Sequence, residues 1–255
     1  MVLTLVTVSC LKDNYAYILR CTETGAVAVV DVPDTAPIIE ALALRGWPLH
    51  QIFLTHHHWD HIDGVAALVA ATGAKVVGAA ADAHRLPPLD VALAEGDDIS
   101  IGSESGTVID VPGHTVGHIA FHFPKSALAF TADSLMAMGC GRLFEGTPAQ
   151  MWDSLQKLMK LPPETLICSG HEYTAANMRF ALALEPDNPD LILRYDRINA
   201  ARSQGMATVP SRLADELATN PFLRTHTPQI KTALGTPNAT SAEAFADLRA
   251  RKDSF

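Results

Sequence analysis

The sequence predicts an α+β body followed by a smaller helical part. Short runs of alternating or continuous apolar residues, typical of strands, recur through the first two-thirds of the 255-residue chain. After about Tyr173, helical patterns follow one another and strand patterns nearly vanish. We therefore expect two domains, residues 1–173 and residues 174–255.

The expected strands are short runs of apolar residues or of alternating apolar and polar residues. The N-terminal run alternates apolar and polar residues, which indicates a strand with one buried face. The strands are expected at Val2–Ser9, Tyr15–Arg20, Ala26–Asp31, His50–Leu54, Lys75–Val77, Thr107–Val111, Ile119–Phe123, Leu128–Thr131 and Thr165–Cys168.

The expected helices combine apolar periodicity with capping residues. Thr147 followed by Gln150, and Thr240 followed by Glu243, each have the spacing of a capping box, in which the two residues satisfy free backbone N–H groups at a helix start. The helices are expected at Ala36–Leu44, His61–Ala71, Pro148–Lys160, Ala175–Leu184, Asp190–Ser203, Arg212–Thr219 and Ala242–Lys252.

Composition and charge exclude several classes of protein. The chain is 48% hydrophobic and carries a net charge of −9, which disfavours binding to nucleic acid or to an anionic membrane. No apolar run is long enough to span a bilayer, and the N-terminus does not resemble a signal peptide. The four cysteines are scattered without a C-x-x-C pair, which argues against a disulfide framework. We expect a cytoplasmic protein.

The densest cluster of metal-binding side chains lies in residues 56–61, where four histidines and an aspartate follow an apolar run. In an extended chain, His56, His58 and Asp60 point to one side, whereas His57 points to the other. Imidazole and carboxylate groups at this density suit one or two divalent cations. The alternative is a histidine-rich surface loop.

Three further metal-binding residues follow other expected strands: His114, Asp133 and His171. Because rigid strands can direct the residues at their ends toward a common point, we expect these groups to converge with those of residues 56–61. Seven ligands are too many for one tetrahedral zinc ion but suit two ions roughly 3.5–4 Å apart, with one carboxylate as a bridge. The seven residues are His56, His58, Asp60, His61, His114, Asp133 and His171.

The run of residues 56–61 resembles the H-x-H-x-D-H motif of the metallo-β-lactamase superfamily. Six segments in order, spread over nearly the whole chain, resemble the glyoxalase II (hydroxyacylglutathione hydrolase) family more closely. These segments are Asp13-Asn14-Tyr15, Thr55–His61, Pro112–His118, Gly139–Thr147, Gly170–Thr174 and Asn220–Arg224.

The resemblance implies a metallo-β-lactamase-like αββα sandwich with a binuclear site, followed by a helical domain that helps to bind glutathione. It implies hydrolysis of S-D-lactoylglutathione to D-lactate and glutathione, the second step of methylglyoxal detoxification. The cofactors would be two divalent ions, zinc first and iron or manganese as alternatives, and a hydroxide that bridges them would attack the thioester. The first ion would be bound by His56, His58 and His114 and the second by Asp60, His61 and His171, with Asp133 as the bridge and Asp60 and Asp133 as the catalytic carboxylates.

The substrate would be a small-molecule glutathione thioester, bound by a monomer. The resemblance assigns its glutathione part to Arg142, Phe144, Tyr173, Arg249 and Lys252. Arg249 and Lys252 are three residues apart on an expected helix and therefore share a face. The alternative for this pair is a solvated basic face near the end of a helix.

Two positions depart from the family pattern. Phe144 stands where the family often has tyrosine, so a hydroxyl contact to glutathione is missing and weaker binding is expected. Ala132 precedes the bridging aspartate where the family commonly has glycine. This departure puts the family's strained backbone angle at position 132 in doubt, but the aspartate ligand is retained.

The main alternative function is an iron-dependent dioxygenase of the same superfamily that acts on glutathione persulfide. It would use one ion and leave Asp60 and His171 without a metal. A non-catalytic metal-binding scaffold is disfavoured because the ligand set is complete. A β-lactamase is disfavoured by the missing export signal, and a nuclease by the net charge.

Overall fold

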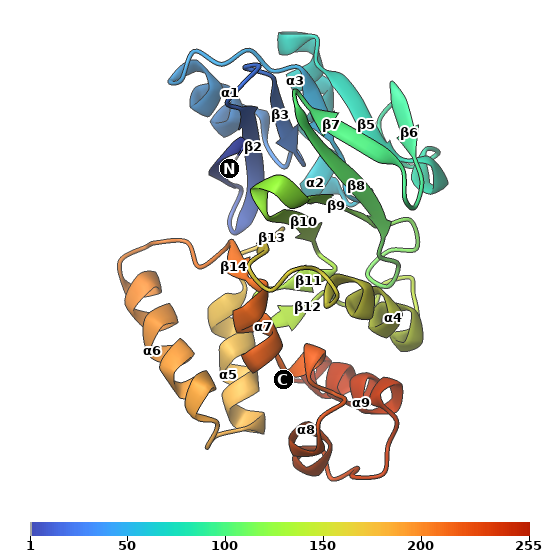
Figure 1. Ribbon diagram of the computed structural model, residues 1–255, viewed down its shortest axis with the longest axis vertical. Coiled ribbons are helices and arrows are strands. Elements are labelled where there is room, and N and C mark those ends of the chain that lie inside the picture. Colours follow the sequence, from blue (N-terminus) through green and yellow to red (C-terminus); the bar gives the residue numbers. More distant parts are fainter. Residues whose placement is uncertain (1) are drawn as a thin grey trace. The chain divides into compact units, whose positions relative to one another are not determined.

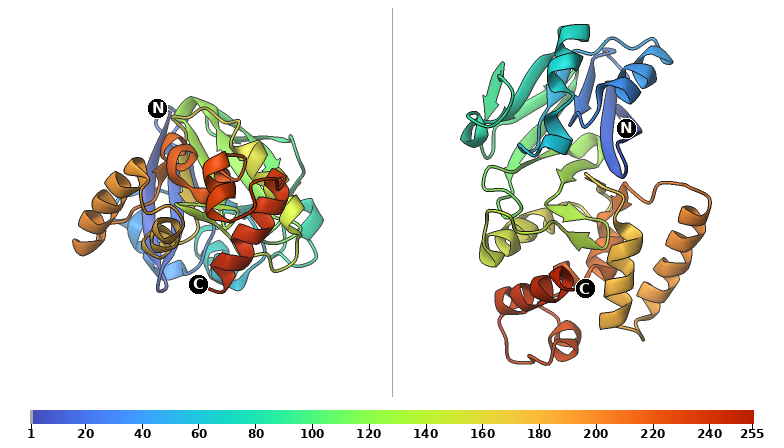
Figure 2. Two further views of the ribbon diagram at one scale, coloured as in Figure 1. Left: turned by 90° about the horizontal axis from the view of Figure 1, so that it is seen from below. Right: turned by 180° about the vertical axis from the view of Figure 1, so that it is seen from behind.

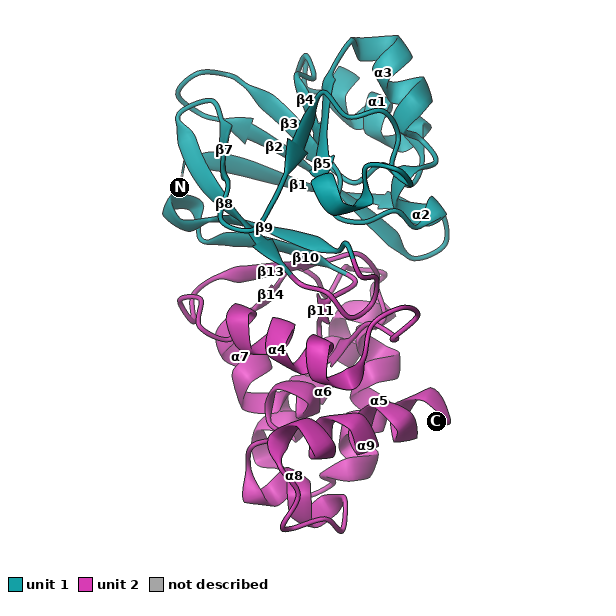
Figure 3. Cartoon of the chain, turned by 90° about the vertical axis from the view of Figure 1, so that its right-hand side faces the viewer, with its two compact units in different colours: residues 1–110, 117–132 teal, residues 111–116, 133–255 magenta. Residues whose placement is uncertain are grey.

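The computed structural model describes residues 2–255, which form two compact units. Unit 1 comprises residues 1–110 and 117–132, and unit 2 comprises residues 111–116 and 133–255 (Figure 3). The chain contains both helices and strands in the order labelled in Figure 1. Among residues 2–255, no helix is both long enough and apolar enough to cross a membrane.

The first sheet of unit 1 combines an antiparallel half with a parallel half. Its first three strands pair antiparallel, and from the third strand onward the pairs are parallel. The parallel half needs crossover connections, and the helices of this unit lie in them. The strands are, in spatial order, β1 (Leu3–Cys10), β2 (Asn14–Cys21), β3 (Val27–Val30), β4 (Gln51–Phe53), β5 (Lys75–Ala79) and β6 (Val91–Leu93).

Four further strands of unit 1 are antiparallel neighbours in chain order. Aromatic side chains join them to the first sheet, because Phe53 contacts Phe121 with ring centroids 5.2 Å apart, and Tyr17 contacts Phe130 at 5.6 Å. The two layers of strands thus enclose a buried apolar core. These strands are β7 (Asp98–Ile101), β8 (Glu104–Asp110), β9 (Ile119–Phe123) and β10 (Leu128–Ala132).

The helices of unit 1 bury apolar side chains, such as Ile38 of α1 (Thr35–Ala43) and Leu68 of α3 (Val65–Thr72). Both helices lie outside the strand layers in Figure 3. Short helical turns complete the unit: α2 (Trp59–Ile62), η1 (Ala80–Asp82) and η2 (Pro124–Ser126).

The prediction of one helix over His61–Ala71 is wrong, because the structure divides this segment into α2 and α3. Gly64 lies at the break and donates its N–H to the carbonyl oxygen of Val32 at 2.9 Å. A Cβ atom at this position would lie 2.7 Å from the Val32 side chain, so only glycine fits so close to the loop after β3. The helix is interrupted because its backbone bonds to that loop instead.

Unit 2 is mainly helical, and its longer helices lie close to their predicted ranges (Figure 2). The predicted capping boxes at Thr147 and Thr240 are confirmed. Its strands are β11 (Leu135–Met136), β12 (Gly139–Cys140), β13 (Leu166–Ser169) and β14 (Ser211–Arg212). Its helices are α4 (Pro148–Leu158), α5 (Thr174–Leu184), α6 (Pro189–Ser203), α7 (Leu213–Thr219), η3 (Pro221–Leu223), α8 (Pro228–Ala233) and α9 (Ser241–Asp253).

A buried polar network holds the β11–β12 hairpin against the helices of unit 2. Glu216 of α7 is fully buried, pairs with Arg194 of α6 and accepts the N–H of Met138 at 2.8 Å. Asn220 donates to the carbonyl oxygens of Met136 and Gly139 at 3.2 and 3.0 Å. A buried charge is tolerated only when it is paired and hydrogen-bonded, and this network meets both conditions.

The longer segment of unit 2 begins at residue 133, whereas the predicted helical domain begins at residue 174. This network explains why the β11–β12 hairpin belongs to unit 2. The hairpin belongs to the part of the sequence that resembles a metallo-β-lactamase, yet its backbone groups bond to the helices that follow. The predicted boundary at residue 173 separates regions of different sequence pattern, not compact units, and it stays a prediction.

The four cysteines are free and buried. Burial raises the pKa of Cys10 and of Cys140 to about 11, and it also raises the pKa of Cys168. These three thiols are therefore protonated at neutral pH and pack as small apolar side chains.

Replacing Glu216 by glutamine should destabilise the protein, because it leaves the buried Arg194 without an opposite charge. We expect the free energy of unfolding, measured by urea denaturation, to fall by about 3 kcal/mol. Glu40→Gln on the exposed surface of α1 is the matched control and should change it by less than about 0.5 kcal/mol. Equal effects of the two substitutions would contradict a stabilising role for the network.

Candidate metal centre

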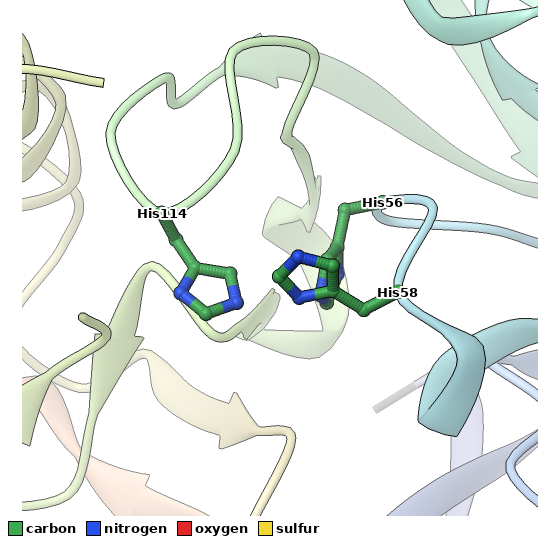
Figure 4. Close-up of side chains that lie close together, drawn as sticks. All are labelled: His56, His58 and His114. Carbon is green, nitrogen blue, oxygen red and sulfur yellow. The ribbon is translucent and has the colours of Figure 1, made fainter. Parts of the chain in front are cut away.

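The loop after β4 presents part of the predicted ligand set in unit 1. His56 and His61 are fully buried, and His58 precedes α2 as its N-cap residue. Figure 4 shows the side chains of His56 and His58. The expectation of an extended chain through Asp60 is wrong, because α2 begins at Trp59 and Asp60 lies in its first turn. The extended segment is therefore shorter than predicted and ends at His58.

Three imidazole rings of this loop are packed together. The ring centroid of His56 lies 4.8 Å from that of His58 and 4.2 Å from that of His61. His118 also stacks on His56 at 4.6 Å with an angle of 12° between the ring planes. Rings at this spacing can offer several nitrogen lone pairs to one small region, as a divalent cation requires.

Two residues of unit 1 that the prediction left out contact the predicted ligands. The carboxylate of Asp31, at the end of β3, lies 2.8 Å from Nδ1 of His61. Asn14 donates to the backbone oxygen and the carboxylate of Asp60 at 3.0 and 3.1 Å. Asp31 follows a buried strand, as the predicted ligands do, but this position in the sequence does not distinguish it from other aspartates.

The ring of His57 lies 5.0 Å from that of His58, and its Nδ1 contacts a carboxylate outside the predicted ligand set. Its Nδ1 lies 3.2 Å from Asp82, which also pairs with Arg85 at 2.6 Å. Gly117 permits this arrangement, because a Cβ atom there would lie 2.2 Å from the carboxylate carbon of Asp82. The Asp82 carboxylate thus joins η1 to the loop before β9 and takes His57 as a structural partner.

Unit 2 brings together His114, Asp133 and His171, all of them buried. Nε2 of His114 lies 3.4 Å from Oδ2 of Asp133, and Nε2 of His171 lies 3.3 Å from the same oxygen. Two ligands of one tetrahedral ion with bonds of roughly 2.1 Å lie about 3.4 Å apart. These contacts therefore fit a carboxylate oxygen that is a ligand beside each imidazole, and the donor set suits divalent metal ions.

Glycine residues make room for these ligands. A Cβ atom on Gly141 would lie 2.0 Å from the carbonyl oxygen of Asp133 and 2.9 Å from Nδ1 of His114. Gly113, directly before His114, has φ +152°, and a Cβ atom there would lie 2.7 Å from Met151. Side chains at either position would displace the backbone that carries a predicted ligand.

Ala132 occupies the left-handed region with φ +39°. The backbone before Asp133 thus has the conformation for which glycine is favoured, and an alanine adopts it here. The departure of this chain from the family pattern therefore introduces strain at position 132, and Asp133 is buried beside both imidazoles all the same.

Positive charge gathers around Lys252 in unit 2. Burial, together with repulsion from Arg249, Arg179 and Arg142, lowers the pKa of Lys252 below its ordinary value. Its ammonium group lies 5.5 Å from the ring centroids of Phe180 and of Phe255. The four cations concentrate positive charge in this region, and the carboxylate of Asp253 lies among them, paired with Arg249 at 2.8 Å and with Arg142 at 3.7 Å. Arg179 was not predicted, because an exposed arginine on a helix resembles an ordinary solvated residue.

The predicted glutathione contacts differ in their surroundings. Arg142 and Phe144 are mostly exposed, and the ring of Phe144 lies 5.3 Å from that of His114. Tyr173 stacks on His171 at 4.6 Å. Arg249 is buried, donates to the carbonyl oxygen of Cys140 at 3.0 Å and pairs with Asp253 at 2.8 Å. Arg249 thus already ties α9 to β12, a role that the sequence did not indicate.

Comparison with known proteins assigns the chain to a family. The metallo-beta-lactamase superfamily matches residues 12–171, and the family described as hydroxyacylglutathione hydrolase C-terminus matches residues 172–255. A curated relative from Jannaschia sp. (strain CCS1), named hydroxyacylglutathione hydrolase, is 66% identical over 98% of this chain and 98% of its own length. The chain belongs to the hydroxyacylglutathione hydrolase family. It is thus a hydrolase of the metallo-beta-lactamase superfamily, and the predicted resemblance is confirmed.

Solved structures agree with this family fold. The BLEG-1 B3 metallo-beta-lactamase has a TM-score of 0.67 at 21% identity, covering 86% of this chain and 99% of its own, and so confirms the predicted fold. TTHA1623, crystallised in a di-iron-bound form, is 33% identical with a TM-score of 0.55, covering 66% of this chain and 91% of its own. The hydroxyacylglutathione hydrolase family therefore shares this fold with proteins that bind metal.

Replacing Ala132 by glycine should relieve the strain before Asp133. The left-handed conformation costs alanine about 1–2 kcal/mol, and the greater freedom of glycine in the unfolded chain offsets about 0.4–1 kcal/mol of the gain. We expect an unchanged or slightly higher free energy of unfolding in urea. Ala129→Gly in the same buried strand lacks such strain and should lower it by about 1 kcal/mol. A similar loss in both variants would contradict strain at Ala132.

Proposed function

We propose that the chain hydrolyses S-D-lactoylglutathione and related 2-hydroxyacyl-glutathione thioesters to glutathione and the 2-hydroxy acid. For the lactoyl substrate this reaction is the second step of methylglyoxal detoxification. The observation that carries the proposal is the 66% identity, over 98% of both chains, to a relative named hydroxyacylglutathione hydrolase. The presence of all seven metal-binding residues of the family motif supports it.

We assign the seven residues to two divalent ions. His56, His58 and His114 would hold one ion, Asp60, His61 and His171 the other, and Asp133 both. The contact of one Asp133 oxygen with Nε2 of both His114 and His171 supports the shared role of this carboxylate. Zinc suits this donor set, and iron or manganese would suit it as well.

When bound, such ions lower the pKa of water toward neutrality and polarise a carbonyl group. The carboxylates of Asp60 and Asp133 would orient the attacking water toward the thioester carbon. Water adds to this carbon, the C–S bond breaks, and the products are the 2-hydroxy acid and the thiol of glutathione. Because a free thiol has a pKa near 8.5, the sulfur leaves without a dedicated general acid.

The cations around Lys252 would bind the carboxylates of the glutathione portion. Arg142, Arg249 and Lys252 supply positive charge, and Tyr173, stacked on His171, would contact the peptide next to the reacting group. Phe144 offers a ring but no hydroxyl at this site, consistent with weaker binding. Residues 174–255 would thus form the glutathione-binding domain, which holds the thioester in position for attack.

We place the protein in the cytoplasm as a monomer that acts on a small molecule and binds neither nucleic acid nor membrane. Four free cysteines suit a reducing compartment, in which glutathione is also reduced. The net charge of −9 opposes binding to polyanions.

The decisive experiment measures thiol release from S-D-lactoylglutathione by the purified protein, with elemental analysis of the same sample. We expect rapid release of thiol and close to two metal ions per chain. Oxygen uptake with glutathione persulfide should be absent, and its presence without thioester hydrolysis would favour the dioxygenase instead.

Replacing Asp133 by alanine should abolish turnover and lower the metal content, because the carboxylate shared by both ions is lost. We expect kcat to fall by at least about 1,000-fold, as when a group that acts in the transition state is removed. Asp63→Ala, an exposed aspartate three residues after Asp60, is the matched control and should keep both properties. An active Asp133→Ala enzyme without metal would refute the assignment.

Neutralising Lys252 or Arg142 should weaken substrate binding more than catalysis. Lys252→Gln and Arg142→Gln should each raise KM about tenfold, the effect of a lost charged hydrogen bond, and leave kcat within about twofold. Lys160→Gln, at an exposed position after α4, should leave KM unchanged. Arg249→Ala would also remove buried contacts and is the less selective test. A fall in kcat at constant KM would contradict the binding role.

A further inference from the structure

Asp31 lies at the centre of a hydrogen-bond network in unit 1. Its carboxylate accepts the N–H of Thr55 at 2.9 Å and the hydroxyl of Thr55 at 2.8 Å. The same oxygen that accepts the hydroxyl lies 2.8 Å from Nδ1 of His61, and the Thr55 hydroxyl lies 3.0 Å from Nδ1 of His56. All four side chains are buried, so water does not compete for these bonds.

The proton positions in this network follow from the donors available. An ionised carboxylate only accepts, so Nδ1 of His61 must carry a proton and donate it to Asp31. The Thr55 hydroxyl has one hydrogen, which it donates to Asp31. Its oxygen can then only accept from His56, whose Nδ1 must also carry a proton. In both histidines the lone pair is thereby left on Nε2.

We infer that Asp31 is a positioning residue that sets the tautomer of one histidine ligand of each ion, His61 directly and His56 through Thr55. This inference rests on the proposed function, which assigns these histidines to different ions. Only a neutral imidazole with its lone pair on Nε2 can bind a metal through that atom, so a single carboxylate controls the affinity for both ions.

The backbone around Asp31 supports this role. Its N–H donates to the carbonyl oxygen of Phe53 at 2.9 Å, and the N–H of Val32 donates to that of His61 at 2.8 Å. Asp31 has φ +57°, a conformation that aspartate and asparagine adopt more readily than most residues. The loop is therefore bonded to the segments before and after the ligands, and asparagine can replace Asp31 without new backbone strain.

Asparagine at position 31 should reverse the network. An amide nitrogen in place of the shared oxygen donates to Thr55 and to His61 instead of accepting from them. The Thr55 hydroxyl would then donate to Nδ1 of His56, and in both histidines the proton would move to Nε2, where a metal ion would have to displace it. Valine at position 55 breaks only the link to His56 and leaves the contact between Asp31 and His61.

The test titrates the full-length, zinc-loaded protein with a chelator of known affinity and counts the zinc retained per chain. In Asp31→Asn the affinity for each of the two zinc ions should be about 10–100-fold lower than in the unmodified protein, as expected when a group that orients metal ligands is removed. In Thr55→Val the affinity for one ion should fall by a similar factor, whereas Thr55→Ser should bind both ions as tightly as the unmodified protein.

Asp82→Asn is the matched control, because it changes a buried aspartate that contacts His57, a histidine outside the proposed ligand set. It should retain both ions as the unmodified protein does. Circular dichroism checks the folding of each variant. If Asp31→Asn does not fold, the difference in zinc retention between Thr55→Val and Thr55→Ser still tests whether Asp31 acts on His56 through Thr55.

Retention of both ions in folded Asp31→Asn, or loss of only one, would overturn the inference and leave the proposed function intact. Equal retention in Thr55→Val and Thr55→Ser would overturn it as well. An unmodified protein that binds fewer than two zinc ions would instead refute the binuclear site, and the inference with it. Thiol release from S-D-lactoylglutathione, measured separately, tests the proposed reaction.

Discussion

The orientation of buried imidazole rings is the constraint on which the proposed chemistry depends. Nδ1 of His56, His61 and His114 each lies 2.8–3.0 Å from an oxygen, supplied in turn by a hydroxyl, a carboxylate and a backbone carbonyl. A histidine can bind a metal through Nε2 only when its proton is held on Nδ1. The fold thus has to supply an acceptor for each ring as well as the ring itself.

Two of the three acceptors, Asp31 and the carbonyl of Arg142, lie outside the segment Thr55–His61. The carbonyl that contacts His114 belongs to Arg142, two residues after the end of the β11–β12 hairpin. That hairpin is bonded to the buried Glu216 and Asn220 of the helical segment. The C-terminal helices therefore stabilise the position of a predicted metal ligand.

Much of the fold could be predicted from the sequence because its strands and longer helices carry clear periodic patterns. The ranges that differ have local physical causes. β11, β12 and β14 have two residues each, too few for any periodicity. The break between α2 and α3 depends on the close approach of Gly64 to Val32, which are distant in sequence.

The ligand types could be predicted from motif and spacing, whereas the residues that orient them could not. A single aspartate after a strand, such as Asp31, is common in proteins and becomes significant only when His61 and Thr55 are seen to contact it. Arg179 was missed for a similar reason, since its proximity to Lys252 arises from two helices that are far apart in sequence. Arg249 was predicted as a glutathione contact, with a solvated surface cation as the alternative, and its bond to Cys140, from another part of the chain, was not expected.

The buried cysteines have a consequence for an enzyme that releases a thiol. Glutathione and its oxidised form exchange with protein thiols through the thiolate, and a thiol with a pKa of about 11 is almost fully protonated at neutral pH. Cys10, Cys140 and Cys168 are also inaccessible to a tripeptide. The protein can therefore release a thiol product without forming mixed disulfides at these positions.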